Sequence, residues 1–192
     1  MATLIARHRT AALVAAGQAC FLAMMAACFA IEPSWLALKR GLSFYGNQLQ
    51  TVVPYSLGFA LSVGLSAGGI ALLAPIDVSA KRLRIGLAAL LGLMALIPLT
   101  PYSVDLVFDY VHIGISAALF GAGLLFGLWL ALRVLRRRIA YGAVSAQFAA
   151  GLLALTAQLG WHDYMIPSEL AFQLALGVLV VLGTATRSTL AR

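Results

Sequence analysis

The sequence predicts an all-α membrane protein that crosses the bilayer several times. Hydrophobic residues make up 62% of the 192 residues, charged residues only 10%, and the mean hydropathy is +0.98. A soluble domain carries about 25% charged residues, and a soluble core of this length cannot cover so much apolar surface. The apolar residues form continuous stretches of the ~20 residues that a spanning helix needs, not the shorter alternating stretches of a membrane barrel. We therefore expect a polytopic helical bundle.

Six segments are long and apolar enough to cross a bilayer, and we find no soluble domain or linker, so residues 1–192 form a single transmembrane domain. The first segment begins after Arg7 and Arg9, as a signal peptide would. Its apolar run of about 21 residues exceeds the 7–15 of a signal sequence, so we expect a retained helix. The predicted spanning helices cover about residues 10–31, 51–75, 84–100, 106–133, 140–160 and 168–186.

The distribution of charge predicts the orientation of these helices. With six crossings, all but Lys39 and Arg40 of the 13 basic residues fall on the side of the two termini. Basic residues favour the cytoplasmic side, so we expect both termini in the cytoplasm of a multi-pass protein of the cell membrane. The net charge of +7 then requires no nucleic acid as a partner. Most acids fall on the outer side: Glu32, Asp105, Asp109, Asp163 and Glu169.

Polar residues gather at the outer ends of the predicted helices. Asp105, Asp109 and His112 have the spacing i, i+4, i+7, which places them on one helical face. Glu169 begins the last helix, and segment 41–55 adds further polar groups as a lid at the membrane interface. Polar residues at membrane depth indicate function. We therefore expect an outer-facing pocket that binds a ligand through Ser43, Tyr45, Asn47, Asp105, Asp109, His112 and Glu169.

Several chemistries fit this cluster, and the sequence does not decide whether the protein is an enzyme. The leading interpretation is a pocket that binds a lipid head group or a small solute, with membrane lipids as partners. An alternative is a metal-dependent membrane hydrolase in which His112, Asp109 and His162 hold zinc. Ser43 beside His112 could also serve as nucleophile and base. A transporter is a further alternative, although no charge lies at the expected bilayer centre.

The same residues also permit a purely structural interpretation. Asp109 and His112 could pair with each other, or with Lys39 or Arg40, and so fix the helix ends. The glycine pairs Gly64/Gly68 and Gly123/Gly127 have GxxxG spacing. Such pairs are typical of close helix packing, either within one chain or on a face that forms a homo-oligomer.

Two short patches give the chain a resemblance to a known family. The run Gly41–Asn47 (GLSFYGN), followed by Thr51–Tyr55 (TVVPY) and the stretch Asp109–His112 (DYVH), resembles small bacterial integral membrane proteins of the domain-of-unknown-function 998 type. Those proteins have about this length and six or so helices. The resemblance implies a location in the membrane and no particular activity.

A more distant likeness is to the membrane hydrolases of the alkaline ceramidase and adipoQ-receptor superfamily. These combine a serine, an aspartate and histidines around zinc, and the resemblance implies Ser43, Asp109 and His112 as the counterparts in this chain. The chain departs from that pattern, because it has six predicted helices instead of seven and lacks the paired HxxxH of the last helix. These departures weaken the implication of zinc.

Overall fold

The computed structural model describes residues 2–74, 77–101, 105–161 and 163–189, and this part of the chain is helical without β-strands. A short π-helical turn, η1, extends α6. The elements are α1 (Ala2–Ile31), α2 (Trp35–Arg40), α3 (Ser43–Gly46), α4 (Val52–Ala71), α5 (Val78–Leu96), α6 (Leu106–Trp129), η1 (Leu130–Leu135), α7 (Arg138–Gln158) and α8 (Met165–Thr189).

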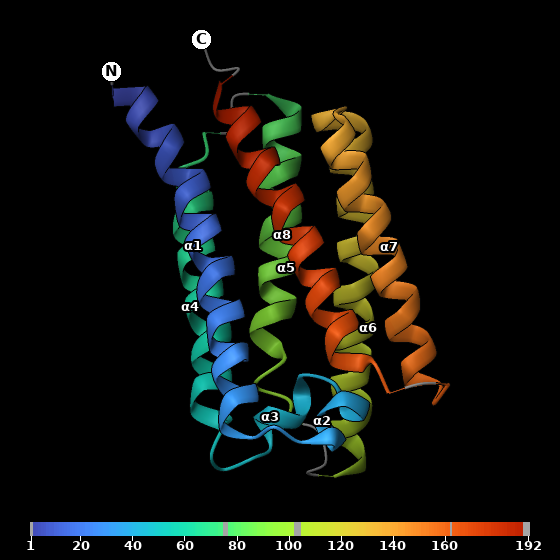
Figure 1. Cartoon of the computed structure of the whole chain (residues 1–192). Helices are drawn as coiled ribbons and strands as arrows, with labels where there is room; N and C mark the ends of the chain where they lie inside the picture. Colours follow the sequence, from blue (N-terminus) through green and yellow to red (C-terminus); the bar gives the residue numbers. More distant parts are fainter. Residues whose placement is uncertain (1, 75–76, 102–104, 162, 190–192) are drawn as a thin grey trace.

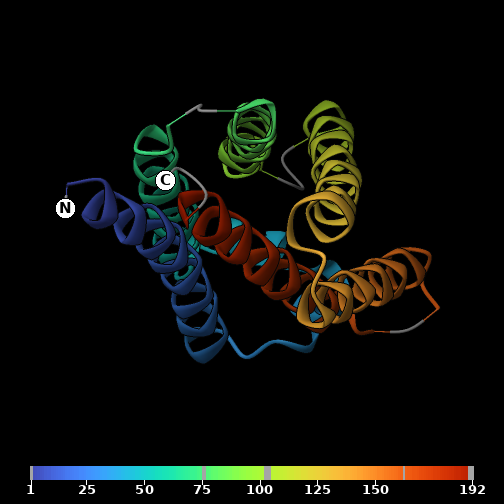
Figure 2. The same ribbon diagram turned by 90° about the horizontal axis from the view of Figure 1, so that it is seen from above.

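The long helices lie side by side, and the short α2 and α3 cross one end of the bundle (Figure 1). The first turns of α1, the last turns of α8 and the connection between η1 and α7 lie at the opposite end (Figure 1). Seen from above, α8 runs through the middle, with α1 and α4 on one side and α6 and α7 on the other (Figure 2). The chain therefore enters and leaves the bundle at the same end.

Five helices are long and apolar enough to cross a membrane. Among the described residues they are Arg9–Ile31, Val52–Ala71, Leu106–Leu135, Arg138–Gln158 and Met165–Thr186. The remaining long helix, α5, has 19 residues, and Lys81, Arg82 and Arg84 lie within its first two turns. These findings are those of an all-helical, multi-pass membrane protein.

The bounds of α5 differ from the predicted segment 84–100 for two physical reasons. Asp77 caps the helix, since its Oδ1 accepts a hydrogen bond from the Ala80 N–H at 2.6 Å, and the helix begins at Val78. Pro98 has no N–H to continue the helical hydrogen bonds, the Leu99 N–H bonds to the Leu96 carbonyl in a tighter turn at 3.1 Å, and α5 ends at Leu96. A prediction based on hydropathy alone places the helix too far along the chain.

Glycines allow α1 and α4 to pack closely, but they are not the predicted GxxxG pairs. A Cβ on Gly17 would lie 2.9 Å from the Ser62 carbonyl oxygen, and one on Gly69 would lie 2.9 Å from the Thr10 carbonyl oxygen. A Cβ on Gly64, by contrast, would meet no described atom within 4 Å. An oligomer through the Gly64/Gly68 face therefore stays a prediction.

The second predicted pair, Gly123 and Gly127, packs inside this chain. A Cβ on Gly123 would lie 3.1 Å from the Phe172 ring of α8, and one on Gly127 would overlap the Oε1 of Gln147 on α7. The Nε2 of Gln147 donates to the Gly123 carbonyl at 3.0 Å. These glycines therefore join α6 to α7 and α8 within one molecule.

Candidate functional site

A cavity of about 440 Å³ opens between α6 and α7 at the end of the bundle that α2 and α3 cross. Small residues create this space, because Ala117 on α6 faces Gly151, Ala154 and Ala157 on α7. The remaining lining residues are Lys39, Arg40, Ser43, His112, Ile113, Ser116, Phe120, Leu124, Leu155, Gln158, Met165 and Glu169. Its polar groups lie at one end, and its deeper walls are apolar.

His112 is the centre of a chain of hydrogen bonds at the polar end. Its Nδ1 lies 2.6 Å from the backbone carbonyl oxygen of Thr100, and its Nε2 lies 2.7 Å from the Ser43 Oγ. A carbonyl can only accept a hydrogen bond, so the Nδ1 must carry a proton. In the neutral imidazole the Nε2 is then an acceptor, and it faces the Ser43 hydroxyl. The side chain of His112 is 5% exposed, so this geometry is largely shielded from solvent.

Tyr55 on α4 borders Ser43 from a second direction. The ring of Tyr55 packs against Gly46, where an added Cβ would lie 2.8 Å from its Cε1. The order of the hydrogen bonds is thus Ser43 to His112 and His112 to Thr100, with Tyr55 beside Ser43.

Glu169 fixes the turn that presents Ser43 to the cavity. Its Oε2 accepts a hydrogen bond from the Leu42 N–H at 2.6 Å, across 127 residues of sequence. The turn itself begins at Gly41, whose φ of 77° and ψ of −172° form a conformation that is essentially confined to glycine. A Cβ on Gly41 would lie 2.7 Å from the same Oε2. The close approach of the Glu169 carboxyl therefore depends on glycine at position 41.

Three of the seven residues predicted to bind a ligand line the cavity, namely Ser43, His112 and Glu169. The other four have different surroundings. Asp105 is exposed and caps α6, its Oδ1 accepting from the Phe108 N–H at 2.9 Å. Asn47 is the exposed residue after α3, and Asp109 lies on α6 one turn before His112, outside the cavity lining.

Tyr45 is the fourth residue that lies away from the cavity. Its side chain is fully buried beside Phe44, with ring centroids 5.6 Å apart. Its hydroxyl has no hydrogen-bond partner among the described residues. Burial raises the pKa of the Tyr45 phenol, and the nearby Cys28 and Glu32 raise it further. Tyr45 therefore contributes to packing at this end of the bundle.

Lys39 forms an ion pair with Asp163, which the sequence did not predict. The Lys39 Nζ lies 3.4 Å from the Asp163 Oδ1 and 5.3 Å from the centre of the Trp35 ring. The other pairings in the structural interpretation, between Asp109 and His112 or with Arg40, stay predictions. Arg40 is exposed and lines the cavity.

The sequence did not predict that the Thr100 carbonyl would accept a hydrogen bond from His112. Every residue has a backbone carbonyl, so no pattern of side chains indicates which one will serve as an acceptor.

The described residues do not assemble a zinc site. No group of three or more His, Cys, Asp and Glu side chains in this part of the chain is placed to hold a metal ion. Both nitrogens of His112 already face the protein atoms described above. His162, the third predicted ligand, lies outside the described residues, so its participation stays a prediction.

Comparisons with known proteins add no relative. The chain matches no family model, no curated protein and no solved structure. The two resemblances in the sequence therefore stay predictions. The fold and the cavity by themselves define a multi-pass helical membrane protein with a polar-ended, apolar-walled pocket between two of its helices.

Proposed function

We propose that this protein binds a lipid in the cavity between α6 and α7. The head group would lie among Lys39, Arg40 and Ser43, and an acyl chain would follow the walls toward Leu124. The amphipathic lining of the cavity is the observation that carries this proposal. A solute without a chain would leave the apolar walls uncovered, whereas a lipid matches both ends.

The dimensions of the cavity support a chain-bearing ligand. His112 and Leu124 are 12 positions apart on α6, which corresponds to about 18 Å along a helix with a rise of ~1.5 Å per residue. The polar end therefore lies near the end of the bundle, and the apolar end reaches well into it. Ile113, Phe120 and Leu155 line the space between these ends.

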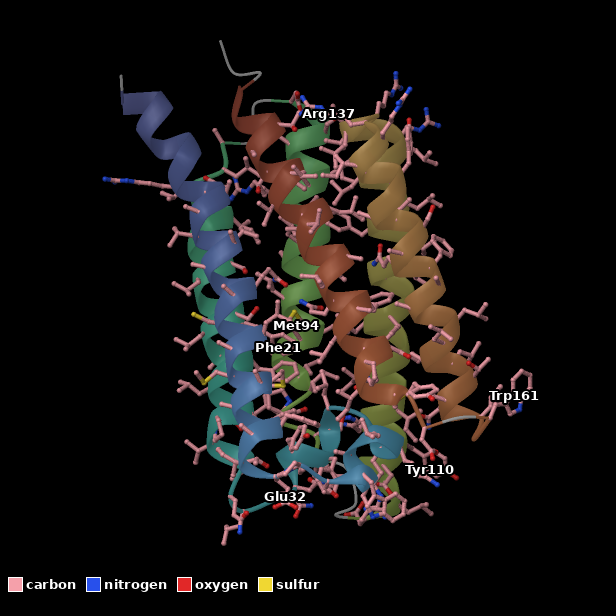
Figure 3. All side chains as sticks on the ribbon, in the orientation of Figure 1. Phe21, Glu32, Met94, Tyr110, Arg137 and Trp161 are labelled. Atoms are coloured by element: carbon pink, nitrogen blue, oxygen red, sulfur yellow. The ribbon has the colours of Figure 1, made fainter. Side chains whose placement is uncertain are left out.

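Charge supports an anionic head group. Among the described residues, Lys39 and Arg40 are the basic side chains at this end of the bundle, and both line the cavity. Arg137, by contrast, lies at the opposite end of the bundle from Glu32, Tyr110 and Trp161 (Figure 3). At this end of the bundle, the basic side chains that could bind a phosphate or carboxylate lie at the cavity.

The proposal includes an orientation in the cell membrane. We propose six crossings, with α5 as the sixth, and both termini in the cytoplasm. Eleven of the 13 basic residues then lie inside, and the two that line the cavity lie outside. The shared end of the first turns of α1 and the last turns of α8 supports an even number of crossings (Figure 1). The cavity would open toward the outer leaflet.

Cysteine labelling in intact cells tests this orientation. In a background carrying Cys20→Ala and Cys28→Ala, Asp105→Cys should react with an impermeant maleimide from outside. Arg82→Cys, at the other end of the bundle, should react only after the cells are permeabilised. Labelling of Arg82→Cys in intact cells would reverse the proposed orientation.

Thermal unfolding of the purified chain in detergent tests the binding of lipid. We expect phosphatidylglycerol to raise the melting temperature more than phosphatidylcholine, since a ligand at 100 times its Kd stabilises by about 2.7 kcal/mol. Arg40→Gln should remove this difference, and its charge-matched control Arg82→Gln should retain it. Equal losses in both variants would show that net charge, and not the cavity, accounts for the effect.

A second pair of variants tests the walls. Ala117 and Ala118 are both exposed neighbours on α6, but only Ala117 lines the cavity, so Ala117→Leu would fill it. Ala117→Leu should therefore abolish stabilisation by phosphatidylglycerol, and Ala118→Leu should not. Full stabilisation of Ala117→Leu would place the lipid elsewhere and overturn the proposal.

A further inference from the structure

We propose that Ser43 and His112 form a nucleophile–base pair that cleaves an acyl ester of the lipid held in the cavity. This inference rests on the proposed lipid pocket and adds a reaction to it. Two hydrogen bonds carry it: the Ser43 Oγ lies 2.7 Å from the His112 Nε2, and the His112 Nδ1 lies 2.6 Å from the Thr100 carbonyl oxygen.

The second of these bonds distinguishes the pair from a chance contact between a serine and a histidine. A histidine can accept the proton of a serine only if the facing nitrogen is unprotonated and its ring is fixed. The Thr100 carbonyl meets both conditions, because it requires the proton on the Nδ1 and holds the ring from the opposite side. It also faces the positive charge that the ring acquires when its Nε2 takes a proton. Thr100 is thus a positioning residue.

The third component is access to a substrate. Ser43 and His112 both line the cavity, and the apolar lining residues Ile113 and Phe120 follow His112 along α6. In a lipid with its head group at Lys39, Arg40 and Ser43 and its chain toward Leu124, the first ester carbonyl next to the head group would come within reach of Ser43. The substrate class is therefore an acyl ester of an anionic lipid.

The reaction balances with water as the only co-reactant. The Ser43 hydroxyl transfers its proton to the His112 Nε2 as its Oγ bonds to the carbonyl carbon of the ester. The bond from that carbon to the alcohol oxygen then breaks, and the His112 Nε2 returns the proton to the alcohol. A water molecule gives a proton to the same nitrogen as its oxygen bonds to the acyl carbon. The bond from that carbon to the Ser43 Oγ then breaks, and the His112 Nε2 returns the proton to the Oγ. The free fatty acid and the Ser43 hydroxyl result, and nothing is oxidised or reduced.

An alkyl fluorophosphonate tests the pair directly, because an activated serine bonds to its phosphorus and expels fluoride. We expect the folded wild-type chain in detergent to be labelled on the peptide that contains Ser43, and the heat-denatured chain not to be. Ser43→Ala should lose this label. His112→Ala should be labelled roughly 100 to 10,000 times more slowly, the range by which a general base accelerates a reaction. Ser145→Ala, which changes an exposed serine of α7 outside the cavity lining, should keep the wild-type rate.

Labelling of Ser43 in the wild-type chain tests the nucleophile–base pair even where a variant fails to fold. An unlabelled Ser43 in wild-type protein that is still stabilised by phosphatidylglycerol would overturn this inference and leave the lipid pocket in place. Labelling of Ser43 in protein that phosphatidylglycerol does not stabilise would support the pair and overturn the pocket. Release of fatty acid from phosphatidylglycerol vesicles by the wild type, and not by Ser43→Ala, would support both.

Discussion

The contact between Gly41 and Glu169 predicts the loss of stability caused by Gly41→Ala, and a double-mutant cycle can test that prediction. Gly41→Ala would force a non-glycine residue into the backbone conformation with φ of 77° and ψ of −172°, at a cost of about 1–3 kcal/mol. Its Cβ would also lie 2.7 Å from the Glu169 Oε2, so the carboxyl must move and release the Leu42 N–H. Loss of that bond costs a further ~1–3 kcal/mol. We expect a total of about 2–6 kcal/mol.

A double-mutant cycle separates these two contributions. In a Glu169→Ala background the clash and the hydrogen bond are both absent, so Gly41→Ala should cost only the backbone part, about 1–3 kcal/mol. Gly160→Ala is the matched control, since Gly160 has a φ of 79° but its Cβ would meet no described atom within 4 Å. Its cost should not depend on Glu169. Reversible unfolding by dodecyl sulfate in mixed micelles, followed by circular dichroism, measures the free energy of unfolding of the wild type and of each variant.

Two outcomes would refute this reasoning. The first is a cost of Gly41→Ala that does not exceed that of Gly160→Ala. The second is additivity of Gly41→Ala and Glu169→Ala within about 0.5 kcal/mol, the agreement expected of sites that do not interact.

Three other predictions can be measured in the same unfolding assay. Gly127→Ala should destabilise by about 1–3 kcal/mol, because its Cβ overlaps the Gln147 side chain. Gly64→Ala, whose Cβ would lie in open space among the described residues, should be neutral or slightly stabilising. Equal effects of the two substitutions would contradict the packing described for α6. Asp105→Ala should cost about 1 kcal/mol through loss of the α6 cap, and a loss of lipid binding at unchanged stability would instead show a role in the pocket. Tyr45→Phe should be neutral or stabilising by up to about 1 kcal/mol, since it removes a buried hydroxyl that lacks a partner in the described part of the chain. Because the folded-state pKa of Tyr45 is raised, the wild type should lose stability as the pH rises above the usual phenol pKa of 10.0, and Tyr45→Phe should lose less; identical pH profiles would contradict this assignment.

The sequence predicts most of the fold because continuous apolar stretches are a strong signal. Five of the six predicted segments correspond to helices that satisfy the requirements for a membrane span. The segment 84–100 deviates because the Asp77 cap and Pro98 set the bounds of α5, and neither depends on hydropathy. The helix α3 lies in segment 41–55, which was expected only as an interfacial lid, and α2 was not predicted. Six and four residues are too few for a periodic pattern.

The candidate site could be predicted in part. Ser43, His112 and Glu169 were placed at one end of the bundle from the threading alone, and the structure brings them to one cavity. Asp105 was placed with them by helical spacing, but its φ of −156° and ψ of 172° put it before the helix begins, where that spacing does not apply. A pocket was expected, but the Thr100 carbonyl and the apolar walls of the cavity could not be predicted, because both depend on how separate segments pack.

The order of contacts along the chain has a consequence for biogenesis. The extensive helix interfaces join α1 to α4 and α7 to α8, which are successive apolar spans, so each hairpin can associate soon after its second helix enters the membrane. The hydrogen-bonded group instead joins Ser43, Thr100 and His112 from three separate segments. The turn before Ser43 also waits for Glu169, which arrives with the last helix. A ribosome-bound chain that lacks α8 would therefore hold its first hairpin while the turn that presents Ser43 stays unsupported. Newly made protein would acquire the proposed activity only at the end of synthesis.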